Sequence, residues 1–208
     1  MKIYKTPRFS KWIFPKKTWG FSNKLPVVYL TFDDGPDPEI TPWVLDVLKE
    51  KGLKATFFCV GQNVKNHPDI YQRMLAEGHQ VGNHTMQHNK GTHTSFENYI
   101  TSVEHAQELI HSRLFRPPYG RITPKQTAYL KKKFTIVMWT WLSYDYDRTV
   151  SIETILDKAK KHIKAGDILV FHDNKKTKDR LKELLPEVIE IIRSKNLRFL
   201  KITDHVAI

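Results

Sequence analysis

Residues 27–36, VVYLTFDDGP, join a short apolar run to two adjacent aspartates and a glycine–proline turn. The β-branched and aromatic residues of the run predict a buried strand that ends near Asp33. Asp33 and Asp34 stand side by side, and two adjacent carboxylates repel each other unless a cation or a shared proton offsets the repulsion. The alternative is a plain strand-ending turn, since Asp, Gly and Pro all favour turns.

Apolar, strand-like runs recur along the rest of the chain. They lie near residues 27–32, 54–60, 79–83, 113–116, 134–140, 167–172 and 197–202. Helix-like patterns separate most of them, at 38–52, 67–78, 95–113, 151–166 and 178–196, where Pro186 predicts a kink or an early break. Such alternation indicates parallel βαβ units in an α/β fold, either a closed or nearly closed barrel or an open doubly wound sheet. No glycine-rich phosphate loop follows the first strand, which disfavours a nucleotide-binding sheet.

Length and composition indicate one globular domain. The chain has 208 residues, 40% of them hydrophobic, and a net charge of +12, which favours acidic partners such as anionic polymers or lipid headgroups. The single cysteine, Cys59, excludes an internal disulfide, and its apolar surroundings predict a buried side chain. No apolar run reaches the ~18 residues of a membrane span, and the basic N-terminus lacks the apolar core of a signal peptide. We therefore expect a cytoplasmic or membrane-peripheral protein unless a leader has been removed.

The first 25 residues differ from the rest. We predict an N-terminal extension over 1–25 and a catalytic domain over 26–208. Trp12, Phe14, Trp19 and Phe21 alternate with lysines in the extension, and we expect it to wrap the domain and bury these aromatic rings. The alternative is an anchor at a membrane interface, where aromatic and basic side chains both sit well.

Polar residues follow five of the predicted strands. They are Asp33 and Asp34, His84 and His88, Arg116 and Tyr119, Asp145, and His172. The carboxyl ends of the strands of a parallel barrel share one rim, where active sites are built. Turn chemistry alone does not explain so many polar groups at equivalent positions.

His84 and His88 are spaced i, i+4, so on one helical turn they would face the same way and could close on one cation. Alone the pair is weak evidence, because the chain contains ten histidines and a lone pair is more often a surface feature. Together with an aspartate it matches a common catalytic zinc environment with one position open for water. One aspartate of the pair would ligate the ion while the other stays free as a base.

TFDDGP (residues 31–36), His84-Thr-x-x-His88, Arg116-x-Pro-Tyr119 and Val170-Phe171-His172 together resemble the motif set of the polysaccharide deacetylases, the NodB-homology or carbohydrate esterase 4 family. The resemblance runs from about residue 27 to residue 202. It implies a single-domain distorted (β/α)7 barrel with parallel strands. It also implies one divalent metal, usually zinc with cobalt, nickel or manganese as alternatives, and removal of an N-acetyl group from an amino sugar.

The resemblance also implies roles for the first motif residues. Asp34, His84 and His88 would ligate the metal. Asp33 would be the general base that takes a proton from the attacking water, and Arg116 would hold and tune this base. The alternative for Arg116, which precedes two prolines, is a surface residue ahead of a rigid turn.

The remaining motif residues would act on the other side of the substrate. The backbone N–H of Tyr119 would stabilise the tetrahedral oxyanion. His172 would be the general acid that protonates the leaving amine, and Asp145 would orient its ring. The alternatives are a core histidine at 172 and an exposed loop acid at 145.

One stretch departs from the family pattern. A further family motif, the fourth in chain order, usually reads Asp-x-x-Asp-Trp. Here it aligns with residues 142–146, where Leu142 replaces the first acid and Tyr146 replaces the tryptophan. The stretch shapes the groove wall in the family, so the resemblance leaves the substrate preference open. Trp139 and Trp141 precede it and could form part of a sugar-stacking surface, and Tyr119 is a further candidate for substrate binding. The two tryptophans would point the same way by strand alternation, and both could equally be core residues.

The first functional hypothesis is a metal-dependent N-deacetylase that acts on polymers or oligomers. Peptidoglycan-like material is the first choice of substrate and chitin-like material the second. The second hypothesis is an amide hydrolase of the same fold that acts on a small or lipid-linked substrate at the cytoplasmic side. The third is a non-catalytic protein that holds an anionic polymer. A nucleic-acid binder is weaker, because the chain has no recognised nucleic-acid motif.

Overall fold

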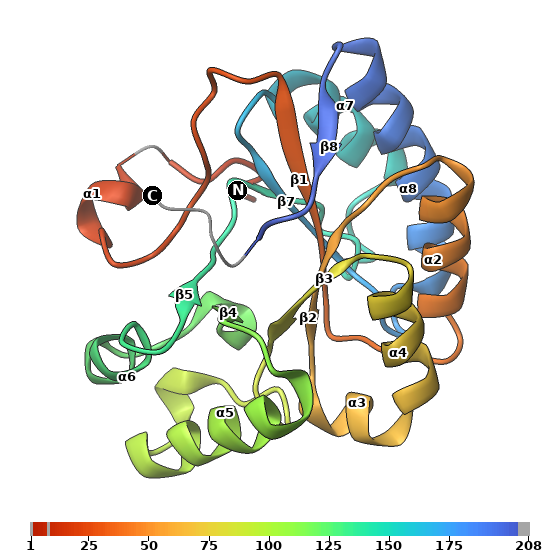
Figure 1. Cartoon of the computed structure of the whole chain (residues 1–208). Helices are drawn as coiled ribbons and strands as arrows, with labels where there is room; N and C mark the ends of the chain where they lie inside the picture. The colour runs from red at the N-terminus through yellow and green to blue at the C-terminus, as the bar shows by residue number, and fades with distance from the viewer. Residues whose placement is uncertain (1, 8, 204–208) are drawn as a thin grey trace.

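A computed structural model describes residues 2–7 and 9–203 of the chain (Figure 1). Residues 1 and 8 of the predicted extension and 204–208 of the predicted domain lie outside this range. The strands are β1 (Val27–Asp33), β2 (Thr56–Cys59), β3 (Gln80–Asn83), β4 (Leu114–Phe115), β5 (Thr135–Ile136), β6 (Trp141–Leu142), β7 (Ile168–His172) and β8 (Arg198–Leu200). The helices are α1 (Ser10–Ile13), α2 (Thr41–Glu50), α3 (Gly61–Asn66), α4 (Pro68–Ala76), α5 (Phe96–Ile110), α6 (Pro124–Leu130), α7 (Ile152–His162) and α8 (Lys178–Ser194).

The strands form one parallel sheet in the order β5-β4-β3-β2-β1-β7-β6, and β8 pairs with the beginning of β1. Figure 1 shows α2, α3, α4, α7 and α8 in a row along one side of the strands. The expected α/β class is confirmed, and the architecture is that of a single-domain distorted (β/α)7 barrel.

Strand β1 is the centre of this sheet, and all seven of its residues are buried. It pairs with β2 through Thr31–Asp33 and with β7 through Tyr29–Asp33. A strand that is covered on both faces needs apolar side chains on both, which explains its unbroken apolar sequence up to the aspartates. The carboxyl end of β1 therefore lies between the ends of two neighbouring strands.

Helix α8 runs without a break through Pro186 to Ser194, so the expected early break is wrong. Buried apolar side chains stand on both sides of the proline at helical spacing, among them Leu181, Leu185 and Ile189. Burial of each such side chain contributes roughly 1.5–3 kcal/mol. Several of them together offset the ~3 kcal/mol cost of a proline inside a helix.

The strand expected over 134–140 is wrong in its extent. Strand β5 ends at Ile136, the chain bends at Thr140, and a further strand, β6, begins at Trp141. Strand alternation therefore does not apply between Trp139 and Trp141. Trp141 is fully buried in the main core, 5.7 Å from the Phe171 ring between centroids.

The N-terminal extension lies against the sheet. A parallel bridge joins Thr18 to Val137, directly after β5, and an antiparallel bridge joins Lys5 to Trp141 in β6. The extension thus links the two end strands of the sheet order. Because it supplies backbone hydrogen bonds to both strands, it helps to close the barrel.

The aromatic rings of the extension are divided between the core and the surface. Trp19 and Phe21 are partly buried and pack against core clusters, which confirms the expectation for these two rings. The expectation is wrong for Phe14 and above all for Trp12, which is 87% exposed. Cys59 is fully buried, as expected. Among the helices of residues 2–7 and 9–203, none is both long and apolar enough to cross a bilayer.

We predict that Trp141→Ala lowers the free energy of unfolding by about 3–5 kcal/mol, because it leaves a large cavity in the core. Urea denaturation at 25 °C measures this change. Trp12→Ala is the matched control and should change the free energy by less than ~0.5 kcal/mol, since its side chain is exposed. A cost below ~1 kcal/mol for Trp141→Ala would show that this ring does not support the core.

Candidate active site

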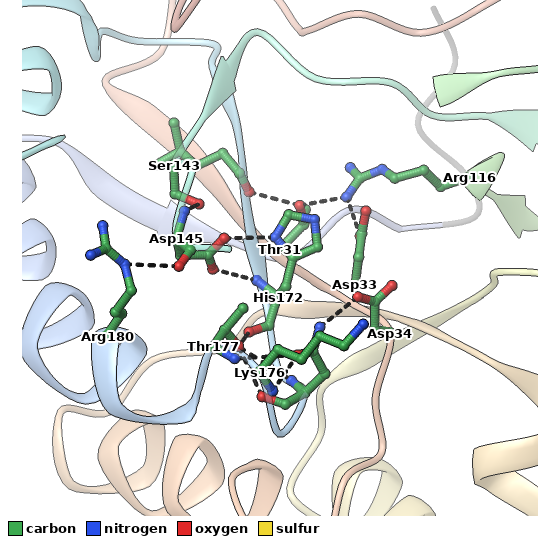
Figure 2. Close-up of polar contacts among 12 residues, drawn as sticks. Thr31, Asp33, Asp34, Arg116, Ser143, Asp145, His172, Lys176, Thr177 and Arg180 are labelled. Atoms are coloured by element: carbon green, nitrogen blue, oxygen red, sulfur yellow. Dashed lines mark hydrogen bonds and ion pairs between the residues drawn. The ribbon is translucent and has the colours of Figure 1, made fainter. Parts of the chain in front are cut away.

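The polar residues singled out in the sequence do meet at the carboxyl ends of the strands. Asp33 ends β1, His172 ends β7, His84 follows β3 and Arg116 follows β4. Figure 2 shows Arg116 with Asp33 on one side of this rim and Asp145 with His172 on the other. A cleft of about 950 Å³ opens over the rim, and Asp33, Asp34, His84, His88, Tyr119 and His172 line it.

Asp33 and Arg116 form a buried ion pair. The Arg116 Nη1 donates to Asp33 Oδ1 at 2.6 Å and to Thr31 Oγ1 at 2.8 Å. Arg116 is fully buried and Asp33 nearly so, so the surface alternative for Arg116 is wrong. An arginine is not deprotonated in proteins, so a fixed positive charge faces the carboxylate of Asp33.

The rest of the guanidinium is fully engaged as well. Its Nε donates to the carbonyl of Val137 at 3.3 Å, and Nη2 donates to that of Met138 at 3.1 Å. The guanidinium carbon lies 4.0 Å from the centre of the Phe58 ring. Burial lowers the pKa of Arg116, while the charge of Asp33 and its hydrogen bond act to raise it. These partners fix the direction from which Arg116 approaches Asp33.

Asp34 turns away from its neighbour. Its φ of 84° lies in the left-handed region, which a residue with a side chain seldom adopts. The Asn63 Nδ2 donates to the Asp34 carbonyl at 2.7 Å and holds this conformation. The two adjacent carboxylates therefore point to different partners, Asp33 to Arg116 and Asp34 to the histidines.

His84 presents a free nitrogen to Asp34. Its Nδ1 lies 2.7 Å from the carbonyl oxygen of Arg116. A carbonyl can only accept a hydrogen bond, so Nδ1 carries the proton and Nε2 keeps its lone pair. Burial lowers the pKa of His84 to about 4. The ring is therefore neutral at pH 7, which is the form that binds metals.

His84 and His88 lie on a loop after β3 and not on a helical turn, so that expectation is wrong. Thr85 and His88 both have positive φ, 64° and 56°. Hydrogen bonds from Thr85 N to Asn83 Oδ1 and from Asn89 N to Thr85 Oγ1 hold the loop. The centroids of the two imidazole rings lie 5.1 Å apart. The rings therefore converge, as the i, i+4 spacing predicted, but they do so through a loop and not through a helical turn.

Asp34, His84 and His88 can hold a metal ion, since their ligand atoms all lie within 4.8 Å of one another. Asp34 Oδ1 lies 3.1 Å from His88 Nε2 and 3.6 Å from His84 Nε2. This oxygen is buried and has no hydrogen-bond partner among the described residues. Burial would raise the pKa of Asp34, but the adjacent imidazole groups of His88, His172 and His84 hold it below its usual range. A buried anionic oxygen between two imidazole nitrogens fits a divalent cation.

His172 and Asp145 form the second ion pair of the rim. The His172 Nδ1 lies 2.7 Å from Asp145 Oδ1, and the His172 backbone N–H donates to Asp145 Oδ2 at 2.7 Å. Burial would lower the pKa of His172, but the charge and hydrogen bond of Asp145 and the charges of Asp34 and Asp33 raise it to about 10. The imidazole is therefore protonated at pH 7.

Asp145 is fully buried, so the exposed-loop alternative is wrong. The Arg180 Nε donates to its carbonyl at 3.0 Å from α8, and Ser143 Oγ accepts from its N–H at 3.3 Å. Figure 2 shows Arg180 and Ser143 on either side of Asp145. The carboxylate that faces His172 is thus fixed by the loop after β6 and by α8.

Tyr119 lies at the edge of the cleft in a short 3-10 turn, where its φ is 58°. The N–H groups of Gly120 and Arg121 donate to the carbonyls of Pro117 and Pro118. No group of residues 2–7 and 9–203 accepts a hydrogen bond from the Tyr119 N–H. The Tyr119 ring packs 4.6 Å from the His88 ring between centroids. A backbone donor is thus available beside the metal ligands.

The cleft wall contains Trp139 but not Trp141. Trp139 lines the cleft together with the two residues that depart from the fourth motif, Leu142 and Tyr146. Tyr146 stands edge-on to His172 at 5.1 Å between ring centroids. A substrate contact by Trp141 is ruled out because that side chain is buried in the core.

Sequence reasoning missed Asp173, which supports the loop of the adjacent aspartates. Its Oδ1 accepts from Gly35 N at 3.2 Å and its Oδ2 from Thr41 Oγ1 at 2.6 Å. A Cβ at Gly35 would lie 2.2 Å from Asp173 Oδ2, so only glycine fits this approach. Burial raises the pKa of Asp173 well above its usual range. The sequence feature that could have indicated this role is the position of Asp173 directly after His172, where β7 ends beside β1.

Known proteins of similar sequence and structure share this arrangement of elements. Residues 22–138 match the model of the polysaccharide deacetylase family. A peptidoglycan-N-acetylglucosamine deacetylase of Bacillus cereus is 31% identical over 194 residues, which cover 90% of this chain and 91% of that protein. A chitooligosaccharide deacetylase of Sinorhizobium fredii is 36% identical over 156 residues, 71% of this chain and 72% of that protein.

A crystal structure of a peptidoglycan N-acetylglucosamine deacetylase superimposes on the chain with a TM-score of 0.86 and 30% identity. The superposition covers 95% of this chain and 95% of that one. The likeness therefore extends over nearly the whole fold. On the match of sequence and the match of structure, the chain belongs to the polysaccharide deacetylase family.

Proposed function

We propose that this protein is a metal-dependent N-deacetylase that hydrolyses the acetamide of N-acetylated amino sugars in peptidoglycan-like or chitin-like chains. One observation carries the proposal. Asp33, which is paired with the buried Arg116, and a protonated histidine, His172, line the same cleft as the three metal-ligand candidates. Amide hydrolysis needs this combination of a base and an acid beside a Lewis acid.

The metal would be held by Asp34, His84 and His88. Two imidazole nitrogens and one carboxylate oxygen are a donor set of catalytic zinc, with cobalt, nickel or manganese as alternatives. Such an ion lowers the pKa of a water molecule and polarises a carbonyl group. The family is metal-dependent, and zinc is our choice of ion for this site because both histidines offer Nε2.

The chain's own residues then move two protons. Asp33 accepts a proton from the attacking water, and Arg116 holds the carboxylate in place during the transfer. The N–H of Tyr119 donates to the carbonyl oxygen of the acetamide as negative charge develops on it. His172 gives its Nε2 proton to the amine nitrogen as the C–N bond breaks. Acetate and a free amino sugar leave.

The cleft suits a sugar ring. The aromatic rings of Trp139, Tyr119 and Tyr146 line it around the polar rim, and such faces pack against the apolar side of a saccharide. Peptidoglycan-like material is our first choice of substrate and chitin-like oligomers the second. A small or lipid-linked amide is the alternative, and a polymer-binding protein without catalysis is the third possibility.

We predict that Asp33→Asn lowers acetate release by about 10²–10⁴-fold, because it removes the base. The zinc-loaded protein is incubated with N-acetylglucosamine oligomers and with peptidoglycan fragments, and acetate is measured. Bound zinc is quantified in parallel. Asp33→Asn should keep its zinc, whereas Asp34→Asn should lose both zinc and activity.

The matched control is Asp157→Asn on the exposed face of α7, which should behave as wild type. Acetate release that survives in Asp33→Asn would exclude this residue as the base. Zinc-loaded wild type without release from either polymer would favour the small or lipid-linked amide, and the absence of both zinc and release would favour the binding protein.

We predict that Asp145→Asn moves the alkaline limit of activity to lower pH. His172 must be protonated to act, and its raised pKa of about 10 keeps the proton on as the pH rises above 7. Removing the Asp145 charge lowers this pKa, so the variant loses the proton earlier. The measurement is kcat/KM against pH for both proteins. An unchanged alkaline limit would mean that Asp145 does not set the protonation of His172.

We also propose that the extension binds an anionic lipid surface. Its exposed apolar patch consists of Phe9, Trp12, Ile13 and Phe14. Lys17 lies beside the patch, with its Nζ 4.8 Å from the centre of the Phe14 ring, and Lys16 is exposed. Apolar rings beside lysines suit the boundary between headgroups and acyl chains. The net charge of +12 favours an anionic surface.

Sedimentation with vesicles tests this surface. Wild type should bind vesicles that contain phosphatidylglycerol and not those of phosphatidylcholine alone. A Phe9→Ser, Trp12→Ser double variant should bind at least ~10-fold more weakly, because it loses buried apolar area. Leu75→Ser, at an exposed leucine of α4, is the control and should bind as wild type. Binding that the double variant retains would point to charge alone, as for an anionic polymer.

A further inference from the structure

The loop after β7 reaches across to the metal-ligand candidate Asp34. The Asn174 Nδ2 donates to Asp34 Oδ2 at 2.7 Å. The neighbouring Lys175 N–H donates to Asp37 Oδ2 at 2.9 Å, which joins the same two loops a second time. Figure 2 shows Asp34 facing the loop that carries Lys176 and Thr177.

The orientation of the Asn174 amide is set by its own loop. Its Oδ1 accepts from Lys176 N at 2.9 Å and from Thr177 N at 3.3 Å. Because backbone N–H groups can only donate, the oxygen of the amide must face them and the nitrogen must face Asp34. The Thr177 Oγ1 donates to the carbonyls of Asn174 and His172 and holds both ends of the turn.

This contact leaves the two oxygens of Asp34 unequal. Oδ2 accepts from Asn174, while Oδ1 is buried without a hydrogen-bond partner among the described residues. Oδ1 is also the oxygen that lies 3.1 Å from His88 Nε2 and 3.6 Å from His84 Nε2. The Asn174 amide occupies one acceptor site of Oδ2 and fixes the direction of the carboxylate, so Oδ1 is the oxygen that faces the two histidines.

We propose that Asn174 is a positioning residue for the metal site. Its Nδ2 holds Asp34 Oδ2, so that Oδ1 is the oxygen that Asp34 would offer to an ion beside the two histidines. This rests on the proposed metal site and not on the identity of the substrate. Partners that orient a metal ligand commonly contribute about 10–100-fold in metal affinity, so Asn174 belongs to the ion-binding machinery although it does not touch the ion.

The test is zinc affinity, measured by competition with a chromophoric chelator in the absence of any substrate. Asn174→Ser keeps a hydroxyl that can accept from the loop N–H groups but cannot reach Asp34. We expect it to bind zinc about 10–100-fold more weakly than wild type. Asn66→Ser, at the exposed end of α3, is the matched control and should not change the affinity.

A second readout reports coordination directly. The visible absorption of the cobalt-loaded protein should weaken in Asn174→Ser, because a released Asp34 can bind the ion through both oxygens and raise its coordination number. Asn174→Asp keeps the acceptor of the turn but places a second carboxylate against Asp34, and it should also alter the spectrum. Thermal melting of the metal-free Asn174→Ser protein shows whether this variant is folded. If it is not, the zinc affinity and cobalt spectrum of Asn174→Asp test the proposal instead.

An affinity within about twofold of wild type together with an unchanged cobalt spectrum would overturn the proposal. A wild-type protein that binds zinc but releases no acetate would contradict the proposed function and leave this test intact. A wild-type protein that binds no zinc would overturn the metal site and the role of Asn174 together.

Discussion

A fully buried guanidinium holds the interior of this barrel together. Arg116 comes from the end of β4, yet its donors reach Thr31 and Asp33 on β1 and the carbonyls of Val137 and Met138 beyond β5. Removing one partner of a buried ion pair typically costs about 3–5 kcal/mol, because the other charge stays buried without compensation. The same contacts that join opposite parts of the sheet therefore fix the carboxylate of Asp33 at the rim. The packing of the barrel interior and the position of the Asp33 carboxylate therefore both depend on Arg116.

The two adjacent aspartates become understandable from this constraint. Asp33 ends a buried strand and faces the interior and Arg116, while the positive φ of Asp34 turns the next carboxylate toward the histidines. Gly35 then lets the chain pass close to Asp173. Asp33 and Asp34 thus lie in different environments. Asp33 lies beside the fixed charge of Arg116, and Asp34 lies beside two imidazole rings that suit a metal ion. A plain turn would need neither set of partners.

Much of this could be predicted from the sequence. The strands up to β4, and also β7 and β8, have clear apolar runs, and the residues of the rim follow them, so both the α/β class and the site set were accessible. The local geometry of the loops could not be predicted from the sequence. His84 and His88 converge through a loop with positive φ at Thr85 and His88, which residue spacing does not reveal. The bend at Thr140 separates Trp139 in the cleft from Trp141 in the core, and strand alternation cannot anticipate a bend. Helices α3 and α6 are short and carry weak apolar patterns, so their stability comes from tertiary contacts.

We propose that Asp34 ligates a metal ion with His84 and His88 while Asp33 stays free beside Arg116. Anomalous diffraction at the zinc edge from a crystal of the zinc-loaded protein tests it directly. We expect one zinc ion at about 2.0–2.2 Å from Asp34 Oδ1 and from the Nε2 atoms of both histidines. We also expect Asp33 to remain paired with Arg116. Zinc bound to Asp33, or zinc located away from the two histidines, would contradict it.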